Sequence, residues 1–431
     1  MKLELRAPRR ARKRARRALT PDPDGLALLT GPDGRGFAQA AVAHRGGTLL
    51  GAHLDHIDHQ LAGGTTVLYS CDVGWPDARR LEVVGLTWRG SGLNASDMDA
   101  EVFHDRDHEV AAWIYPGDPD LPGLARATVA DAVVALLKEH RLIDASVGAS
   151  RVELSMVSYR PRCRAVVRAV ITPSVNGARS RRVFYLKAFT ADDAPRARHR
   201  LELLSQVGLP VARLLAVTSD HLFVLESLPG EPMARHLCDR DAEARGEEML
   251  ALLDALPADL STLPGRPAWA DAVTHYADVL DAQQPEVGER AHRIAESVSG
   301  SLKGIAEGRE PTHGDFHEGQ LYLASGRISG VLDIEAAGPG RRVDDLACMI
   351  AHLSAVRQVD DAHSTGVGAL IDGLLTVFDR RVDPVELRIR AAGVAVSLAS
   401  GPYQEQDPHW RDQTNAILDA ADRLLGMADG V

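Results

Sequence analysis

Two short segments carry side chains that could perform phosphoryl transfer: HGDFHEGQ at 313–320 and VLDIE at 331–335. This chemistry needs a carboxylate to orient an acceptor hydroxyl and take its proton, and we expect Asp315 to serve there. It also needs oxygen ligands for Mg²⁺, which the Gln320 amide and the Asp333 carboxylate can supply. A cation must steady the nucleotide phosphates, and Lys187 in FYLKAF is the candidate. The alternative is a purely structural role, in which the Asp315 carboxylate caps a turn of the loop.

The elements around these residues predict a mixed fold with two parts. Strands are predicted at 152–159, 164–172 and 182–189, with an Asn176-Gly177 hairpin signal, then a helix at 195–208 and two more strands up to Leu228. From Pro229 onward most segments have the apolar periodicity of amphipathic helices. HGDFHEGQ and VLDIE interrupt this helical half as a loop and a short strand. Five strands with one helix, followed by a helical half with a polar loop, are typical of a bilobal kinase.

Several motifs together resemble the aminoglycoside phosphotransferase and choline kinase superfamily. HGDFHEGQ and VLDIE resemble its HGDxxxxN loop and Asp-centred triplet, and GRRVDDLA at 340–347 resembles the segment that follows. Within this superfamily, three features are closer to maltokinases and related sugar and aminosugar kinases. They are Gln320, the DxE triplet and the segment YRPRCRAVVRAV at 159–170. The resemblance covers about 125–431 and implies an α+β, protein-kinase-like fold with ATP and Mg²⁺ as co-substrate and cofactor.

The resemblance also implies a role for individual residues. Asp315 would be the catalytic base, and Gln320 and Asp333 would ligate Mg²⁺. Lys187 would contact the α- and β-phosphates, and the backbone of 226–228 would contact the adenine. The candidate nucleotide-binding residues are therefore Lys187, Glu202, Glu226 and Leu228. Supporting residues are His313, Glu335 and Asp345, and candidate acceptor contacts are His317 and Trp410.

The first hairpin departs from the kinase pattern because it has no glycine-rich loop. Residues 159–164 read YRPRCR, and Arg162 and Arg164 could bind phosphate by charge where glycines would do so by backbone approach. The alternative is an exposed basic hairpin. Gln320 in place of Asn keeps the amide oxygen and adds one methylene of reach, so the change does not indicate an inactive protein.

The 431 residues are too many for one ordinary core. We expect a disordered basic arm at 1–19, a small β-rich module at 20–122 that includes the strand-like run GLALLTG, a kinase N-lobe at 123–228 and a helical C-lobe at 229–431. The net charge of -11 argues against a nucleic-acid partner, and no stretch is long enough for a membrane span. Four scattered cysteines suit a reducing cytoplasm. An oligomer formed through the N-terminal module is left open.

The sequence thus predicts a small-molecule kinase that phosphorylates a hydroxyl of a sugar, aminosugar or aminocyclitol. Two alternatives remain. An antibiotic-modifying phosphotransferase would use the same chemistry on a cationic acceptor. A nucleotide-binding pseudokinase that acts as a scaffold is favoured by the missing glycine loop and disfavoured by the intact Asp315, Asp333 and Lys187.

Overall fold

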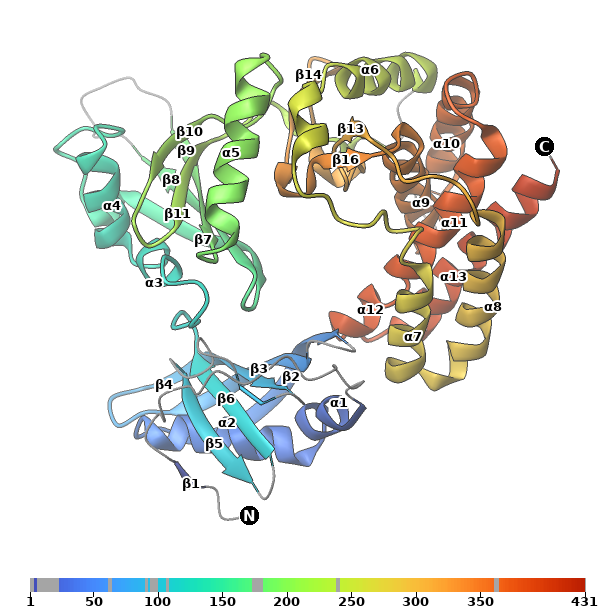
Figure 1. Cartoon of the computed structure of the whole chain (residues 1–431). Helices are drawn as coiled ribbons and strands as arrows, with labels where there is room; N and C mark the ends of the chain where they lie inside the picture. Colours follow the sequence, from blue (N-terminus) through green and yellow to red (C-terminus); the bar gives the residue numbers. More distant parts are fainter. Residues whose placement is uncertain are drawn as a thin grey trace. The chain divides into compact units, whose positions relative to one another are not determined.

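The computed structural model describes residues 4–5, 23–60, 64–89, 92–93, 100–105, 108–172, 181–237, 241–359 and 364–430. The chain forms two compact units (Figure 1). The first consists of Met1–Pro195, Arg213–Ser227 and Gln404–Gln406, and the second of Arg196–Ala212, Leu228–Tyr403 and Asp407–Val431. The Asn176-Gly177 turn and residues 1–3 and 6–19 of the basic arm lie outside the described residues.

The first unit begins with a six-stranded antiparallel sheet and two helices. Its strand order is β1-β5-β6-β4-β3-β2. Helix α2 lies against one face of this sheet and buries Phe37, Ala38, Ala41 and Val42 (Figure 1). The bounds are β1 Glu4–Leu5, α1 Pro23–Thr30, α2 Pro32–His44, β2 Thr48–Gln60, β3 Gly64–Gly74, β4 Arg79–Trp88, β5 Glu101–Asp105 and β6 His108–Ile114.

The predicted β-rich character of this region is confirmed, but one predicted strand is wrong. GLALLTG is not a strand: it forms most of α1, with Leu26, Leu28 and Leu29 buried. The run contains Leu and Ala and lacks β-branched residues before its final Thr, so its intrinsic preference is helical. Pro23 and Pro32 stand at the first positions of the two helices, where the missing N–H costs nothing.

A second antiparallel sheet in this unit has the order β10-β11-β9-β8-β7. The predicted strands and the helix after them are confirmed. Helix α4 covers one face, where Val133, Leu136 and Leu137 join a core with Val167, Leu186 and other sheet residues. The bounds are α3 Leu124–Ala127, α4 Ala130–Glu139, β7 Val152–Arg160, β8 Arg164–Ile171, β9 Arg182–Phe189, β10 Leu214–Val217 and β11 Leu222–Glu226. The helix between β9 and β10, α5 Asp193–Gln206, belongs to the second unit from Arg196 onward.

The segment YPGDPDLPGL between the two sheets is an ordered loop organised by the buried Asp118. Oδ2 of Asp118 accepts hydrogen bonds from the Tyr159 hydroxyl (2.8 Å) and the Arg162 backbone N–H (2.8 Å). Oδ1 accepts from the Asp120 N–H at 3.0 Å. Trp113 donates its indole N–H to the Tyr159 oxygen at 3.0 Å. One carboxylate therefore ties this loop to the first hairpin of the five-stranded sheet.

Replacing Asp118 tests this connection. Asp118→Ala should lower the free energy of unfolding by about 3 kcal/mol, because it leaves a buried hydroxyl and two backbone N–H groups without their acceptor. Urea unfolding measures the loss, and the exposed Asp192→Ala provides a matched control. Equal stability of the two variants would contradict the structural role of Asp118.

The second unit is mainly helical, as predicted, and has one continuous core. Phe316 of the HGDFHEGQ loop and Leu346, Met349 and Ile350 of α9 belong to that core. The helices are α6 Ala242–Asp254, α7 Val273–Gln283, α8 Pro285–Ser301, α9 Arg342–Val359, α10 Ser364–Phe378, α11 Pro384–Leu398, α12 Gly401–Gln404 and α13 Trp410–Asp429. The short strands are β12 Glu231–Pro232, β13 Glu310–Thr312, β14 Leu321–Ala324, β15 Arg327–Val331 and β16 Gly338–Gly340.

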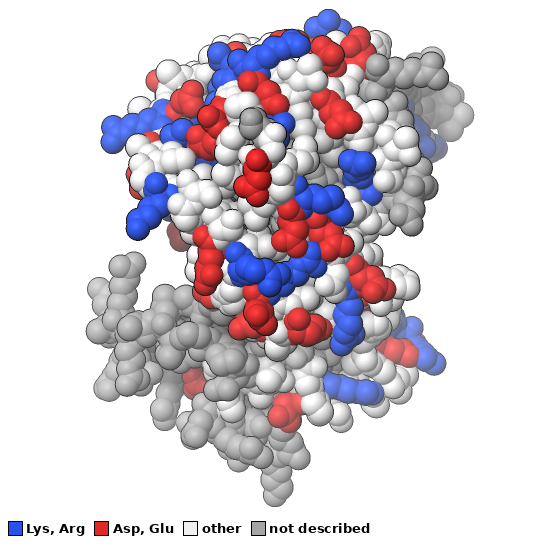
Figure 2. Space-filling model, turned by 90° about the vertical axis from the view of Figure 1, so that its right-hand side faces the viewer, with Lys and Arg blue, Asp and Glu red and all other residues white. Residues whose placement is uncertain are grey.

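The five-stranded antiparallel sheet and the helical C-terminal region confirm the predicted fold class. None of the described helices is long and apolar enough to cross a membrane. On the face of the molecule in Figure 2, the acidic and basic side chains of the described residues are interspersed.

Candidate active site

The HGDFHEGQ loop lies between two short antiparallel strand pairs of the second unit. It leaves β13, which pairs with β16, and enters the β14–β15 hairpin. Gln320 directly precedes β14, and Asp333 follows β15 by two residues. The Leu332 N–H donates to the Gln320 carbonyl at 2.8 Å. The twelve residues between Gln320 and Asp333 therefore contain the hairpin, and its two ends meet.

The side chains of the two predicted metal ligands are in contact. The Gln320 Nε2 lies 3.3 Å from Oδ2 of Asp333. Asp333 has a left-handed backbone, with φ 51° and ψ 45°. Non-glycine residues adopt this conformation at a cost, and Asp is one of the few that tolerate it. The structure thus brings together the amide and the carboxylate expected to hold Mg²⁺, and both are oxygen donors of the kind Mg²⁺ prefers.

The backbone of the loop is held by the buried Asp345 at the start of α9. Its Oδ2 accepts the His313 N–H at 2.9 Å and its Oδ1 accepts the Gly314 N–H at 2.8 Å. Burial raises the pKa of Asp345, although His313, the two backbone donors and Arg342 oppose this shift. Two N–H groups on one carboxylate fix the position of the residues immediately before Asp315.

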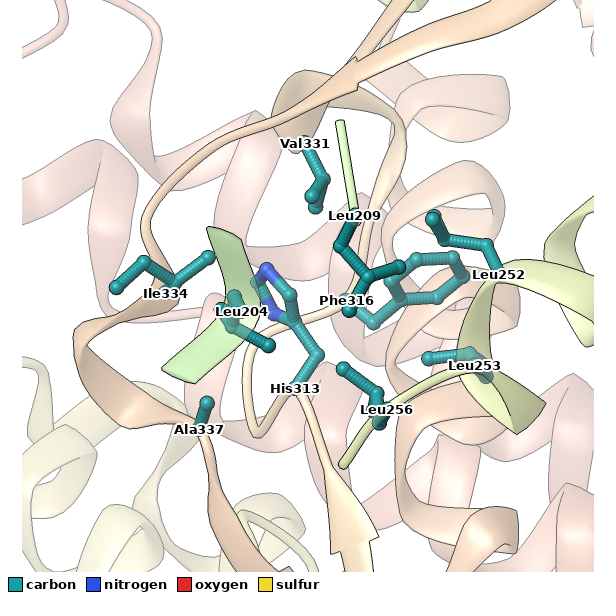
Figure 3. Close-up of a pocket in the computed structure, with 10 residues that line it drawn as sticks. All are labelled: Leu204, Leu209, Leu252, Leu253, Leu256, His313, Phe316, Val331, Ile334 and Ala337. Carbon is teal, nitrogen blue, oxygen red and sulfur yellow. The ribbon is translucent and has the colours of Figure 1, made fainter. Parts of the chain in front are cut away.

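His313 braces the same loop with its imidazole. Its Nδ1 accepts from the Asp315 N–H at 3.3 Å, so the ring N–H is on Nε2 and donates to the Leu332 carbonyl at 2.8 Å. Figure 3 shows the ring among apolar side chains from α5, α6 and the segment after β15, with Phe316 beside it. The remaining cavity measures about 10 Å³, so the loop rests on a nearly filled apolar surface.

Position 314 requires a glycine for two reasons: the space beside its Cα and its positive φ angle. Its φ is +81°, and a Cβ at this position would lie 2.6 Å from the Ala336 carbonyl oxygen. Gly326, in the turn between β14 and β15, has a similar φ of +74° with no atom within 4 Å of the Cβ position. The two glycines therefore separate backbone strain from steric overlap.

We predict that Gly326→Ala costs about 1 kcal/mol of unfolding free energy, from backbone strain alone. Gly314→Ala should cost at least about 3 kcal/mol, because the loop must also move away from Ala336. Urea denaturation of both variants measures the difference. Equal losses would show that the close approach at Gly314 has no energetic consequence.

Helix α9 supplies further groups beside Asp315. Ligand atoms of Asp315, Cys348 and His352 all lie within 4.8 Å of one another, as do those of His317, Glu318 and His352. The His317 and His352 rings are stacked, with centroids 3.9 Å apart and an interplanar angle of 8°. Burial, together with the neighbouring His317, lowers the pKa of His352 well below its usual value.

This shift predicts how stability depends on pH. In the unfolded chain His352 takes up a proton near pH 6.5, whereas the folded protein keeps it neutral. The contribution of His352 to the stability of the folded protein is therefore fully present above pH 6.5. It is lost as the pH falls toward the pKa of His352 in the folded protein. Between about pH 7 and pH 5.5 the wild type should lose about 1 kcal/mol more than His352→Phe. Urea unfolding at each pH measures this difference, and parallel pH profiles would contradict it.

Lys187 lies on β9, the middle strand of the five-stranded sheet in the first unit. It faces Val166 of β8 and Phe223 of β11 in the strand register and is buried. Its Nζ lies 5.3 Å from the centroid of the Phe189 ring. Lys187 and the residues of the HGDFHEGQ loop belong to separate units.

The arginines of the first hairpin have different surroundings. Arg162 is buried, its Nε donates to Asp120 at 2.7 Å, and its guanidinium lies 5.6 Å from the centroid of the Trp113 ring system. Its charge already has a partner in the loop that precedes α3. Arg164 is partly exposed at the start of β8. Phosphate contact by either arginine stays a prediction.

Helix α5 contributes one arginine that sequence reasoning missed. Arg200 is buried and donates to the Ala337 carbonyl (2.6 Å) and the Pro264 carbonyl (2.9 Å), so it binds the backbone that follows the VLDIE segment. Glu202 on the same helix is exposed and pairs with Arg198 at 2.7 Å. The place of Glu202 in the nucleotide-binding set stays a prediction.

The predicted nucleotide hinge coincides with the boundary of the two units. The first unit includes residues up to Ser227, and the second resumes at Leu228. The Glu226 N–H donates to the Arg213 carbonyl at 2.9 Å, and its carboxylate pairs with the Arg213 side chain. The backbone of 226–228 therefore forms a covalent crossing between the units.

The two remaining candidates lie apart along the chain. Glu335 is in the short 3₁₀ turn Ile334–Ala336 directly after Asp333. Trp410 begins α13, where its ring packs edge-on against Tyr403 at 5.0 Å and beneath Arg411 at 4.0 Å. In Figure 1, α12 just before it lies well away from β13 and β16. Acceptor contact by Trp410 stays a prediction.

The family comparison agrees with the chemistry of these residues. Residues 175–377 match the model of the APH family, described as the phosphotransferase enzyme family. This range is 203 of the 431 residues and contains Lys187, the HGDFHEGQ loop, Asp333 and Asp345. The predicted enzyme class, a phosphotransferase that acts on a hydroxyl group, is thereby confirmed, whereas the match does not address the maltokinase-like branch. No curated protein is similar enough in sequence to match the chain.

Solved structures of phosphotransferases are similar in fold only. A thermostable mutant of aminoglycoside phosphotransferase APH(4)-Ia is 17% identical, with a TM-score of 0.48 over 69% of this chain and 99% of that one. Choline kinase LicA from Streptococcus pneumoniae is 13% identical, with a TM-score of 0.45 over 68% and 98%. Macrolide 2'-phosphotransferase MphH from Brachybacterium faecium is 17% identical, with a TM-score of 0.40 over 67% and 98%. Such distant likeness carries no argument about substrate.

Proposed function

We propose that this chain is an ATP- and Mg²⁺-dependent kinase that phosphorylates a hydroxyl of a sugar, aminosugar or aminocyclitol. The observation that carries the proposal is the pairing of Gln320 with Asp333, 3.3 Å apart, beside a loop whose backbone is fixed by the buried Asp345. A pair of oxygen ligands next to a rigidly held carboxylate is what positioning catalysis requires.

Each residue would act through one stated atom or group. Asp315 would orient the acceptor hydroxyl and take its proton. The Gln320 amide oxygen and the Asp333 carboxylate would hold Mg²⁺, which supplies charge neutralisation of the transferring phosphate when bound. Lys187 would steady the α- and β-phosphates, and the backbone of 226–228 would contact the adenine. We place the reaction in the cytoplasm, where ATP is supplied.

The sugar-like acceptor is inferred from residues that depart from the commonest loop pattern. Gln320 and Glu335 resemble the corresponding residues of sugar and aminosugar kinases. An aminoglycoside-type antibiotic acceptor is the second candidate, because the chain is acidic, with a net charge of -11, and such acceptors are cationic. APH(4)-Ia, one of the similar structures, has been solved with hygromycin B and either ADP or AMP-PNP.

Asp315→Asn tests the mechanism directly. We expect it to abolish phosphoryl transfer while ADP still binds with the wild-type dissociation constant, because the amide cannot accept the hydroxyl proton. Coupled ADP-release kinetics and calorimetric ADP titration measure the two quantities. Near-normal turnover in Asp315→Asn would overturn the assignment of the base.

The acceptor is identified by turnover on a panel of sugars, aminosugars and aminoglycosides. Turnover on a neutral sugar or aminosugar supports the proposal, and turnover on aminoglycosides alone favours the antibiotic-modifying alternative. If the wild type binds nucleotide and transfers phosphate to no member of the panel, the nucleotide-binding scaffold becomes the better reading.

A further inference from the structure

His317 stands between the predicted metal ligand Gln320 and the helix α9. One ring nitrogen, Nε2, lies 3.0 Å from the Gln320 Nε2, the same atom that lies 3.3 Å from Asp333 Oδ2. The other ring nitrogen, Nδ1, accepts the Gly319 N–H at 3.2 Å. Both ring nitrogens of His317 therefore face the turn that carries Gln320.

The proton on His317 decides which atom of the amide should face it. Because Nδ1 accepts from Gly319, a neutral imidazole carries its proton on Nε2. An Nε2–H donor requires an acceptor, and a half-turn of the Gln320 amide places its oxygen in the position that the nitrogen occupies. Both hydrogen bonds of His317 are then satisfied. With the amide nitrogen facing the ring, a neutral His317 can satisfy only one of them.

The same half-turn changes what Asp333 faces. With nitrogen toward Asp333 the amide is a hydrogen-bond donor to the carboxylate. With oxygen in that place, two oxygens about 3.3 Å apart face each other, and only a cation makes this arrangement favourable. The preference of His317 for the amide oxygen therefore works in the same direction as cation binding.

The ring of His317 is held in place from the side of α9. His352 stacks on it with centroids 3.9 Å apart, and the two planes differ by 8°. The buried Glu318 borders it, with one carboxylate oxygen 3.8 Å from Nδ1. A stacked neighbour limits rotation of the imidazole, so Nε2 stays directed at Gln320.

We propose that His317, held by its stack on His352, is a positioning residue that turns the Gln320 amide oxygen toward a cation beside Asp333. This inference deepens the proposed function and rests on it, because it takes Gln320 and Asp333 as the metal ligands. It assigns His317 to the metal site rather than to the acceptor, and it gives His352 a role that the sequence did not indicate.

The test uses Mn²⁺ as a probe for the cation, added to the full-length protein with saturating ADP. The loss of the free Mn²⁺ signal in electron paramagnetic resonance gives the dissociation constant of the bound ion. His317→Phe keeps the stacked ring and removes both nitrogens, and we expect it to raise this constant about tenfold, as expected when an outer-shell hydrogen bond to a ligand is lost. ADP affinity in the presence of a chelator should not change.

A double substitution separates positioning from a general loss of structure. Because His317 acts through Gln320, His317→Phe should add nothing to Gln320→Ala, so the double variant binds Mn²⁺ as Gln320→Ala does. His352→Phe, which retains a stacked ring, should stay within twofold of the wild type, whereas His352→Ala should weaken Mn²⁺ binding severalfold. His275→Ala, an exposed histidine on α7, is the matched control.

The outcomes distinguish this inference from the function on which it rests. If Gln320→Ala weakens Mn²⁺ binding but His317→Phe does not, only the positioning role is overturned. Multiplicative losses in the double variant would overturn it as well, because His317 would then act independently of Gln320. If Gln320→Ala binds Mn²⁺ as tightly as the wild type, the metal assignment in the proposed function fails, and the inference fails with it.

Discussion

The candidate site depends on one buried carboxylate. Asp345 accepts two successive backbone N–H groups, from His313 and Gly314, and these donors need an acceptor because they lie close to the core. The cost of burying that charge, seen in the raised pKa of Asp345, is offset only while both donors remain in place. The position of Asp315 is thus set by helix α9, whose residue Asp345 lies thirty residues further along the chain.

Much of the fold could be predicted because its signals are local. The strands of the five-stranded sheet and helices such as α6, α9 and α11 follow from apolar periodicity. Helix α8 has the same local signal, because Val287, Ala291, Ile294 and Val298 repeat at helical spacing. The error at GLALLTG has the opposite cause: a short apolar run does not distinguish a strand from a helix, and the helix-forming Leu and Ala decide it.

The residues that carry the chemistry could be predicted from their types and spacing. The residues that hold the surrounding structure in place could not. Gln320 and Asp333 meet because the β14–β15 hairpin joins them, whereas the sequence indicated only a loop and a short strand in this region. Three residues make contacts with partners far away in the sequence: Arg200 with a backbone carbonyl, Asp118 with a hydroxyl and His352 with the face of a second ring. Nothing in a single sequence marks such residues, because their types are ordinary and only the tertiary fold brings each of them to its partner.

The loop around Asp118 also bears on how this protein could have been assembled. Tyr159 and Arg162 belong to the first hairpin of the five-stranded sheet, yet their acceptor lies in the segment that leaves the six-stranded sheet. A recombination event that joined a different N-terminal module at this point would leave that hairpin with unsatisfied donors and an arginine without its counter-charge. The module and the hairpin are therefore expected to be inherited together, as one unit of descent, even though they form separate sheets.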